Sequence, residues 1–306
     1  MVHIRGKGSL VKPPRFEYDA PTEVDHVLSL LHEHGDDAKV LAGGQSLVPL
    51  LNFRLASPAR LIDVNGVGEL SYLRRRDGAL HIGALARQAT VERSSIVAAN
   101  WPILRDAVSF VAHPPIRNRG TIGGSVAHAD PAAEVPAALA ALDARFHLQS
   151  TRGARFVGWR ELFVTHFTTA LEPDELLTKV EVPATRPATG MAFVEFARRH
   201  GDFALGGAAT LVTLDEEHRC THAAISLLAA GPTPVRPEEA ERALVGRRLN
   251  DDVVAEAAAL ATADLESPGD IHASSAYRRR LLEALVRRAV VSAWQRAPCQ
   301  TIGSVA

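Results

Sequence analysis

Cysteine is almost absent from this sequence of 306 residues, in which Cys220 and Cys299 are the only two. Two isolated thiols cannot hold an iron–sulfur cluster or a cysteine-rich zinc site. We therefore interpret both as reduced structural thiols. The thirteen histidines show no HExxH spacing, and His113 and His128 have no partner at metal-ligand spacing, so we assign no metal to the chain.

Aromatic residues make up only 5% of the sequence, and the net charge is −1. Nucleic-acid-binding surfaces combine clustered basic residues with aromatic side chains, so this class of protein is disfavoured. No apolar run is long enough to span a membrane, and residues 1–10 lack the apolar core of a signal peptide. We therefore expect no membrane span and a cytoplasmic location.

The composition is that of an ordinary globular protein, with 46% hydrophobic and 23% charged residues. Residues 1–57 have a βαβ-like pattern, in which Gly35 ends the helix. Residues 58–183 form a second unit of strands and helices. In residues 184–296 three antiparallel strands precede three helices, which is an α+β pattern. Residues 297–306 are predicted to be a loose tail.

Local patterns place the elements within these units. One continuous helix is predicted over residues 90–98. Pro114 and Pro115 are expected to end helix formation, which would leave residues 117–130 as a loop. In the last unit, strands are predicted at 191–197, 207–214 and 221–229, and helices at 238–244, 251–263 and 276–295.

The strongest functional signal is a pair of Gly-Gly turns within residues 39–47 and 117–130, with Gly43 and Gly123 80 residues apart. Each turn follows apolar residues and has a small hydroxyl residue close behind. Glycine lets backbone N–H groups approach an anion closely, and hydroxyl groups can complete the shell around it. Asp130 then offers a carboxylate that can accept hydrogen bonds from a ribose diol. Together these features predict one dinucleotide-sized ligand.

Other readings of the turns remain open. Neither turn has the Lys-Ser/Thr ending of a P-loop, and neither is a GxGxxG motif that opens a long helix. A single Gly-Gly pair after a strand is most often only a tight turn, and Asp130-Pro131 alone would be a turn or a helix cap. The prediction of a dinucleotide site therefore depends on the two Gly-Gly turns and Asp130 occurring together.

The combination resembles the FAD-binding medium subunit of molybdenum hydroxylases, the group of carbon monoxide dehydrogenase and xanthine dehydrogenase. The resemblance is carried by residues 42–47 as the first FAD turn and by residues 117–125 with 129–131 as the second. It continues through residues 174–177, 182–183, 198–204, 231–236, 277–279 and 287–289, in the family's order. The resemblance therefore covers nearly the whole chain.

The resemblance implies a fold, a cofactor and partners. The fold is α+β (α/β): a two-part FAD-binding domain of the vanillyl-alcohol-oxidase (PCMH) type, then a C-terminal α+β domain with a three-stranded antiparallel sheet and helices. The chain would carry FAD and pass electrons to an external acceptor. A large partner subunit would bind the molybdopterin cofactor, and a small partner would carry two [2Fe–2S] clusters, as a dimer of heterotrimers. No catalytic side chain is implied here, because the redox chemistry belongs to FAD.

The resemblance also implies cofactor-binding positions. They surround the two turns and extend to three later positions, where Leu177 would contact FAD and Phe203 would lie beside the isoalloxazine ring. Leu177 and Phe203 have plain core packing as their alternative role. Glu195 departs from the family pattern, which often has lysine there, so the charge near the flavin is in question. The implied residues are Lys39, Ala42, Gly43, Gly44, Gln45, Ser46, Leu47, Gly120, Thr121, Ile122, Gly123, Gly124, Ser125, Asp130, Leu177, Glu195 and Phe203.

Two other functions remain open for a chain with this pattern. One is a stand-alone flavin oxidase or dehydrogenase of the same fold superfamily, which would need its own acid–base residues. The other is a scaffold subunit without flavin. The hydroxylated substrate and the electron acceptor stay undetermined.

Overall fold

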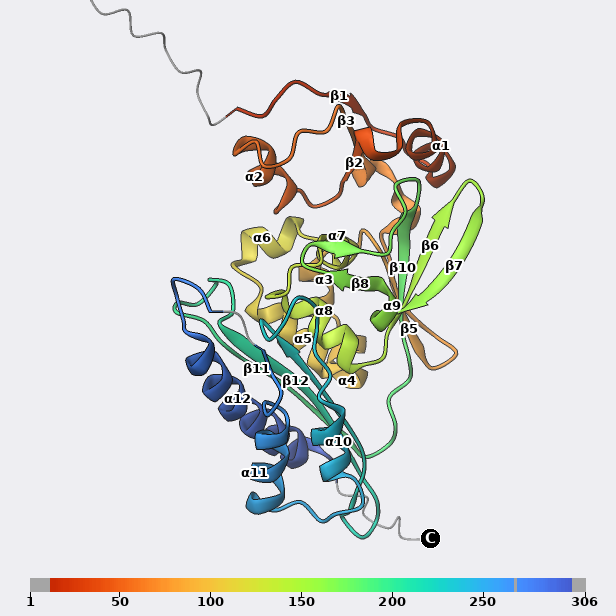
Figure 1. Cartoon of the computed structure of the whole chain (residues 1–306). Coiled ribbons are helices and arrows are strands. Elements are labelled where there is room, and N and C mark those ends of the chain that lie inside the picture. Colours follow the sequence, from red (N-terminus) through yellow and green to blue (C-terminus); the bar gives the residue numbers. More distant parts are fainter. Residues whose placement is uncertain (1–11, 267–268, 299–306) are drawn as a thin grey trace, which may run out of the picture.

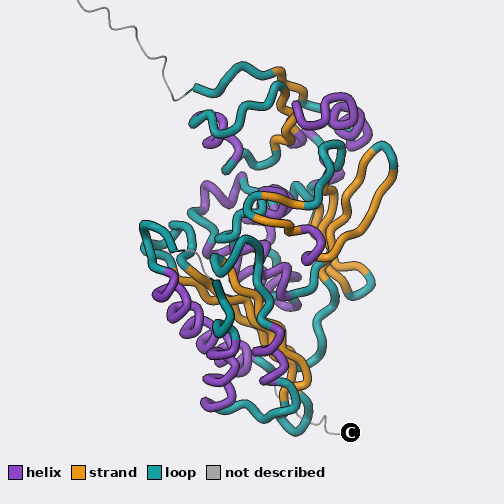
Figure 2. Tube along the Cα trace, viewed as in Figure 1, coloured by secondary structure: helices purple, strands orange, loops and turns teal. Residues whose placement is uncertain are grey.

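A computed structural model describes residues 12–266 and 269–298 of the chain. The chain is built on three main sheets, which lie one below another in Figure 1 and are coloured as strands in Figure 2. The first sheet is parallel and has the order β1 (Glu17–Asp19), β3 (Arg60–Asp63), β2 (Ala38–Leu41). Helix α1 (Val24–His34) connects β1 to β2 and ends at Gly35, as expected, and the strand between them in the sheet, β3, lies beyond residue 57. Helix α2 (Leu47–Asn52), which the sequence pattern did not predict, follows β2.

The second sheet is antiparallel, and most of the chain's helices surround it. Its order is β4 (Leu73–Arg76), β5 (Ala79–Gly83), β10 (Leu176–Val182), β6 (Arg145–Ser150), β7 (Gly153–Gly158). Leu80, Phe146 and Leu148 are fully buried in its core. Its helices are α3 (Gln88–Arg93), α4 (Ser95–Asn100), α5 (Pro102–Phe110), α6 (Pro114–Arg119), α7 (Ile122–His128), α8 (Glu134–Ala141) and α9 (Trp159–Leu162), and a small hairpin joins β8 (Phe163–Thr165) to β9 (Thr168–Thr169).

The third sheet has the predicted three antiparallel strands, followed by the three predicted helices. The strands are β11 (Thr189–Phe196), β12 (Gly206–Leu214) and β13 (Cys220–Leu228), in that order. Helices α10 (Glu238–Leu244) and α12 (Ser275–Arg296) pack on this sheet, and α11 (Asp251–Leu260) packs against both of them (Figure 1). The third sheet with its helices is the α+β unit that the sequence indicated.

Two local predictions were wrong. The helix predicted over residues 90–98 is divided at Ser94, whose hydroxyl accepts a hydrogen bond from the Val97 amide at 3.3 Å and begins α4. Residues 117–130 are largely helical rather than a loop, because Pro114 begins α6 and Thr121 begins α7. Proline is well tolerated in the first turn of a helix, where the missing N–H would have had no partner. Most of the predicted tail, residues 299–306, lies outside the described residues.

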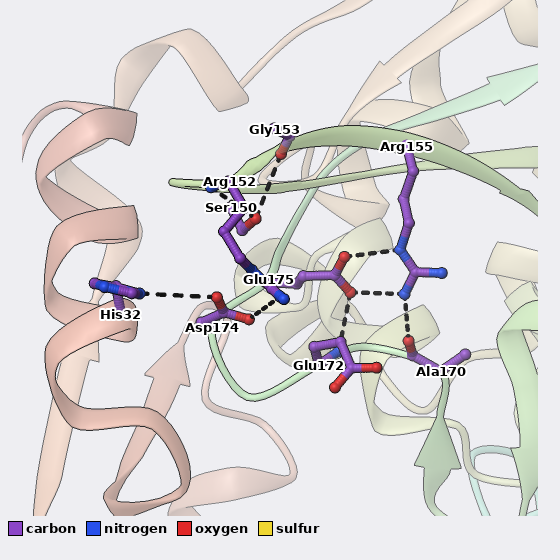
Figure 3. A network of polar contacts seen from close by, with 9 residues as sticks. All are labelled: His32, Ser150, Arg152, Gly153, Arg155, Ala170, Glu172, Asp174 and Glu175. Carbon is purple, nitrogen blue, oxygen red and sulfur yellow. Dashed lines mark hydrogen bonds and ion pairs between the residues drawn. The ribbon is translucent and has the colours of Figure 1, made fainter.

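A polar network joins α1 to the second sheet (Figure 3). Asp174, in the loop before β10, accepts a hydrogen bond from Arg152 at 2.7 Å and lies 3.9 Å from the Nδ1 atom of His32 on α1. The next residue, Glu175, forms a two-point ion pair with Arg155 of β7 at 2.7 and 2.8 Å. The network therefore holds α1, the β6–β7 hairpin and the start of β10 in one arrangement.

Arg236 joins the third sheet's unit to the second. Its side chain is 7% exposed and forms a two-point ion pair with Glu241 of α10, with Nη2 3.0 Å from Oε2. Its Nη1 atom donates to the Ala140 carbonyl of α8 at 3.0 Å and to Asp143 at 3.2 Å. A guanidinium group can satisfy several acceptors in one plane, which suits arginine to this position.

Two carboxyl groups, that of the buried Glu134 on α8 and that of the half-buried Glu195 on β11, lie where α8 meets the third sheet. Burial, and then the charge of Asp130, raises the pKa of Glu134 to about 7. Burial, and then the charge of Glu134, raises the pKa of Glu195 on β11 to about 8, and its Oε2 atom has no hydrogen-bond partner among the described residues. Glu195 is therefore largely neutral at pH 7.

We expect Arg236→Met to reduce the free energy of unfolding by about 3–5 kcal/mol, because it leaves the carboxylate of Glu241 buried without its partner. Urea unfolding followed by circular dichroism measures the change. The matched control is Arg242→Met, which removes an exposed ion pair with Glu239. That control should cost no more than about 0.5 kcal/mol. Equal effects of the two variants would contradict the role given to Arg236.

Glu195→Gln should change how stability depends on pH. Between about pH 4.5 and 8 the unfolded state gives up the proton that folded Glu195 keeps, so this residue's contribution to stability falls as pH rises and is lost above about pH 8. Relative to the wild type, the Gln variant should therefore gain stability across this range and then level off. Thermal melts in a series of buffers measure the difference, with Glu283→Gln on the exposed face of α12 as the control for loss of a carboxylate. A difference that is constant with pH would refute the assignment.

Candidate FAD site

The first Gly-Gly turn forms where β2 ends and α2 begins. Gly44 has a φ of 73°, in the left-handed region that favours glycine. Its carbonyl accepts from the Val48 amide at 3.0 Å, and the Gln45 side chain donates to the Gly43 carbonyl at 2.8 Å. Within the described residues, the amides of four consecutive residues, Gly43 to Ser46, donate to no protein group. Such a row of N–H groups is a ready site for an anion.

The second Gly-Gly turn is the first turn of α7, and its amides are already bonded. Thr121 begins the helix, and its Oγ1 accepts from the Gly124 amide at 3.0 Å. The amides of Ile122 and Gly123 donate to the carbonyls of Ala86 and Ala84 at 3.0 and 2.9 Å, and that of Ser125 donates to Thr121 at 3.1 Å. A Cβ atom on Gly123 would lie 2.6 Å from the Cβ of Ala84, so glycine is required here for packing. The second turn therefore offers a ligand hydroxyl groups and a closely packed surface, but no free amides.

The two turns are in direct contact, as the one-ligand hypothesis requires. A Cβ atom on Gly43 would lie 2.5 Å from the carbonyl oxygen of Arg119 and 2.9 Å from the Cα of Gly120. A Cβ atom on Gly124 would face the Cβ of Ala42 at 3.8 Å. Figure 1 shows α2 of the first unit above α6 and α7 of the second. Residues that are 80 apart in sequence thus form one continuous surface.

Side chains that the sequence analysis did not select connect these turns. The Asn65 side chain donates to the Ala42 carbonyl at 2.8 Å, and Arg87 donates to both Asn65 and the Arg119 carbonyl. Asn65-Gly66 has the sequence of an ordinary turn, and nothing in the sequence near Arg87 distinguishes it from other arginines. Only the contacts identify this pair.

The remaining implied residues lie around the turns in different environments. Lys39 is exposed on β2, and Leu47 begins α2. Asp130 follows the left-handed residue Ala129 at the far end of α7, and its Oδ1 accepts from the Ala132 amide at 2.8 Å, which leaves Oδ2 for another partner. Leu177 is buried in β10, opposite Leu148, as its core-packing alternative predicts.

Phe203 lies in the loop between β11 and β12 and is 77% exposed, so plain core packing does not explain it. The same loop packs against the start of α6, where the rings of His200 and His113 lie 5.8 Å apart. Gly201 has a φ of 87°, and a Cβ atom there would lie 2.6 Å from the His113 ring. The loop is thus held beside the second unit with a large apolar side chain at its surface.

The site fits a dinucleotide with a pyrophosphate group. The free amides of the first turn suit the anion, and the hydroxyl groups of the second turn and the Asp130 carboxylate suit the polar groups beside it. Among the described residues no cluster of three His, Cys, Asp or Glu side chains could hold a metal ion. The part of the chain that the structure describes also contains no helix long and apolar enough to cross a membrane.

Two family models match nearly the whole chain. Residues 14–185 match the FAD binding domain in molybdopterin dehydrogenase, and residues 191–293 match the CO dehydrogenase flavoprotein C-terminal domain. The chain is 47% identical to the 6-hydroxypseudooxynicotine dehydrogenase complex subunit alpha of Paenarthrobacter nicotinovorans, with 94% of this chain and 97% of the relative covered. It is 37% identical to the carbon monoxide dehydrogenase medium chain of Hydrogenophaga pseudoflava, with 93% and 99% covered.

Solved structures agree with these matches. Carbon monoxide dehydrogenase of Hydrogenophaga pseudoflava, in a form that lacks the Mo-pyranopterin moiety of the molybdenum cofactor, superimposes with a TM-score of 0.91 at 38% identity, covering 94% of this chain and 99% of that chain. Quinoline 2-oxidoreductase of Pseudomonas putida 86 superimposes with a TM-score of 0.89 at 40% identity, with the same coverage. The chain therefore belongs to the FAD-binding medium subunits of the carbon monoxide dehydrogenase type of molybdenum hydroxylase, a family of oxidoreductases.

Proposed function

We propose that this chain takes electrons from [2Fe–2S] clusters on a small partner subunit and passes them through FAD to an external acceptor. The observation that carries the proposal is the row of four unpartnered amides at Gly43 to Ser46, packed directly against the second turn. Bound FAD would supply the redox chemistry, because flavin accepts electrons and passes them on. The chain's own residues would bind and orient it.

We assign the binding roles according to which groups are free. The amides of Gly43 to Ser46 would hold the pyrophosphate, with the hydroxyl of Ser46 beside them. The hydroxyl groups of Thr121 and Ser125 would face it from the second turn. The Oδ2 atom of Asp130 would accept a hydrogen bond from the adenosine portion. The exposed ring of Phe203 would cover the flavin and exclude water.

Glu195 would differ in charge from the lysine that the family pattern favours. Its raised pKa means that it would be largely neutral near pH 7 rather than an anion. A neutral carboxyl group would neither stabilise the anionic reduced flavin, as a lysine would, nor destabilise it, as a carboxylate would. We propose that FAD lies between the units of residues 1–57 and 58–183, with residues 184–296 beside them.

We propose that the partners are a large molybdopterin-binding subunit and a small iron–sulfur subunit, arranged as a dimer of heterotrimers in the cytoplasm. The chain cannot supply cluster ligands itself, because it has only two cysteines. Substrate choice would belong to the large partner. Relatives of this chain include subunits of enzymes named for 6-hydroxypseudooxynicotine, caffeine and carbon monoxide, so similarity to medium subunits does not identify the substrate.

Purification of the chain alone and together with its partners tests this function. We expect the chain alone to bind FAD stoichiometrically without oxidising any hydroxylation substrate, and the assembled complex to reduce its flavin when substrate is added. Substrate turnover by the chain alone would favour a stand-alone flavin oxidase. Absence of flavin absorbance after reconstitution with FAD would favour a scaffold subunit without flavin.

Gly43→Ala should weaken FAD binding about 10- to 100-fold, because a Cβ atom 2.5 Å from the Arg119 carbonyl forces the two turns apart. Titration of the apoprotein with FAD, followed by flavin fluorescence, measures the dissociation constant. Gly68→Ala is the control, since a Cβ atom there meets no atom within 4 Å. Equal affinities of the two variants would contradict the assignment of the turns.

A further inference from the structure

A continuous chain of polar side chains runs from β1 to the two turns. Tyr18 donates to Asp63 Oδ2 at 2.5 Å. Asn65 donates to Asp63 Oδ1 twice, through its backbone N–H at 2.9 Å and through its side-chain Nδ2 at 2.6 Å. Arg87 Nη2 then donates to Asn65 Oδ1 at 2.7 Å. The four side chains come from β1, from β3 and the residues after it, and from the segment before α3, so this series of hydrogen bonds runs from the parallel sheet to the segment that leads into α3.

The inner two members hold one turn each. Asn65 Nδ2 donates to the Ala42 carbonyl at 2.8 Å, and Arg87 Nη1 donates to the Arg119 carbonyl. Arg87 also holds the second turn through its backbone, which forms an antiparallel bridge with Thr121. The planar fork of the guanidinium group lets one side chain reach Asn65 and the Arg119 carbonyl together, which an ammonium group on a flexible stem does less well.

The outer two side chains, Tyr18 and Asp63, hold this series of hydrogen bonds in place electrostatically. Burial acts to raise the pKa of Asp63, but hydrogen bonds from Tyr18 and Asn65 and the charge of Arg119 together hold it below its usual value. Asp63 is therefore ionised at neutral pH and is a strong acceptor for the Asn65 side chain. Asn65 in turn is oriented with its oxygen toward Arg87 and its nitrogen toward Ala42.

Because the peptide bond is planar, the hydrogen bond from Asn65 to the Ala42 carbonyl also orients the free amide that follows it. The carbonyl of Ala42 and the N–H of Gly43 belong to one trans peptide unit and point in opposite directions. When Asn65 holds the Ala42 carbonyl, it fixes the Gly43 N–H in the opposite direction, at the start of the row of unpartnered amides. Arg87 fixes the Arg119 carbonyl, against which Gly43 packs.

We propose that Asn65 and Arg87 are positioning residues for the cofactor, which act through the carbonyls of Ala42 and Arg119 to fix the gap between the turns and to aim the Gly43 amide. The inference rests on the proposed function, in which FAD binds at these turns. It adds that the geometry of the anion site is set by side chains of two other segments.

The test compares Asn65→Ala, Arg87→Lys and the double variant in the full-length apoprotein. FAD titration gives the dissociation constant, and thermal unfolding without FAD gives the stability of the empty protein. Each single variant should weaken FAD binding about tenfold, the effect of one lost hydrogen bond to a charged or oriented group. The double variant should be little weaker than either single one, because both changes break the same chain. The melting temperatures of the empty proteins should stay close to that of the wild type.

Arg155→Lys is the matched control. Arg155 also donates to a side chain and to a backbone carbonyl, those of Glu175 and Ala170, but in the network of Figure 3 rather than between the turns. It should leave FAD affinity unchanged. Tyr18→Phe removes only the outermost hydrogen bond and should weaken FAD binding by less than the Asn65 and Arg87 variants. It replaces them as the test if they fail to fold.

The outcomes separate the inference from the proposed function. A wild-type chain that binds no FAD would overturn the proposed function itself. If the wild type binds FAD and the Asn65 and Arg87 variants bind it equally well, only the positioning role is overturned. Three further outcomes would also overturn the positioning role. The losses of affinity could add fully in the double variant, or Arg155→Lys could cause the same loss. The losses could also accompany a fall in the melting temperature of the protein without FAD.

Discussion

The contact between the first turn and the second is the constraint on which the rest of the molecule depends. Gly43 lies against the carbonyl of Arg119 so closely that no side chain fits between them. This contact joins the parallel sheet of the first unit to the helices around the second sheet. Since a Cβ atom in either turn would push backbone against backbone, the glycines are required by tertiary contact as much as by local conformation.

The two turns look alike in sequence but differ in their hydrogen bonding. In the second turn the amides of Ile122 to Ser125 are all satisfied within the protein, as is normal for backbone groups in a folded chain. In the first turn the amides of Gly43 to Ser46 have no partner among the described residues. These free amides are the donors to which we assign the anion, and the second turn packs against them.

Much of this arrangement could be predicted from sequence, and the misses have physical causes. The three-stranded sheet and its helices followed from their apolar sequence patterns, and the central strand β12 is buried on both faces. The helices α6 and α7 were missed, because Pro114 was interpreted as a helix breaker although it begins a helix. Asn65 and Arg87 were missed because their importance comes from contacts with residues 23 and 32 positions away. Phe203 was selected by resemblance alone, and its exposure was not predictable from local sequence.

The sequence by itself determined the family, the cofactor class and the positions of both glycine turns, because these depend on residue types at fixed spacing. It also excluded iron–sulfur clusters from this chain, since that requires only a count of cysteines. The tertiary structure decided which amides are free, which side chains set the gap between the turns, and that Glu195 holds its proton to about pH 8. These properties depend on burial and on partners from distant segments, and packing in three dimensions alone brings such partners together.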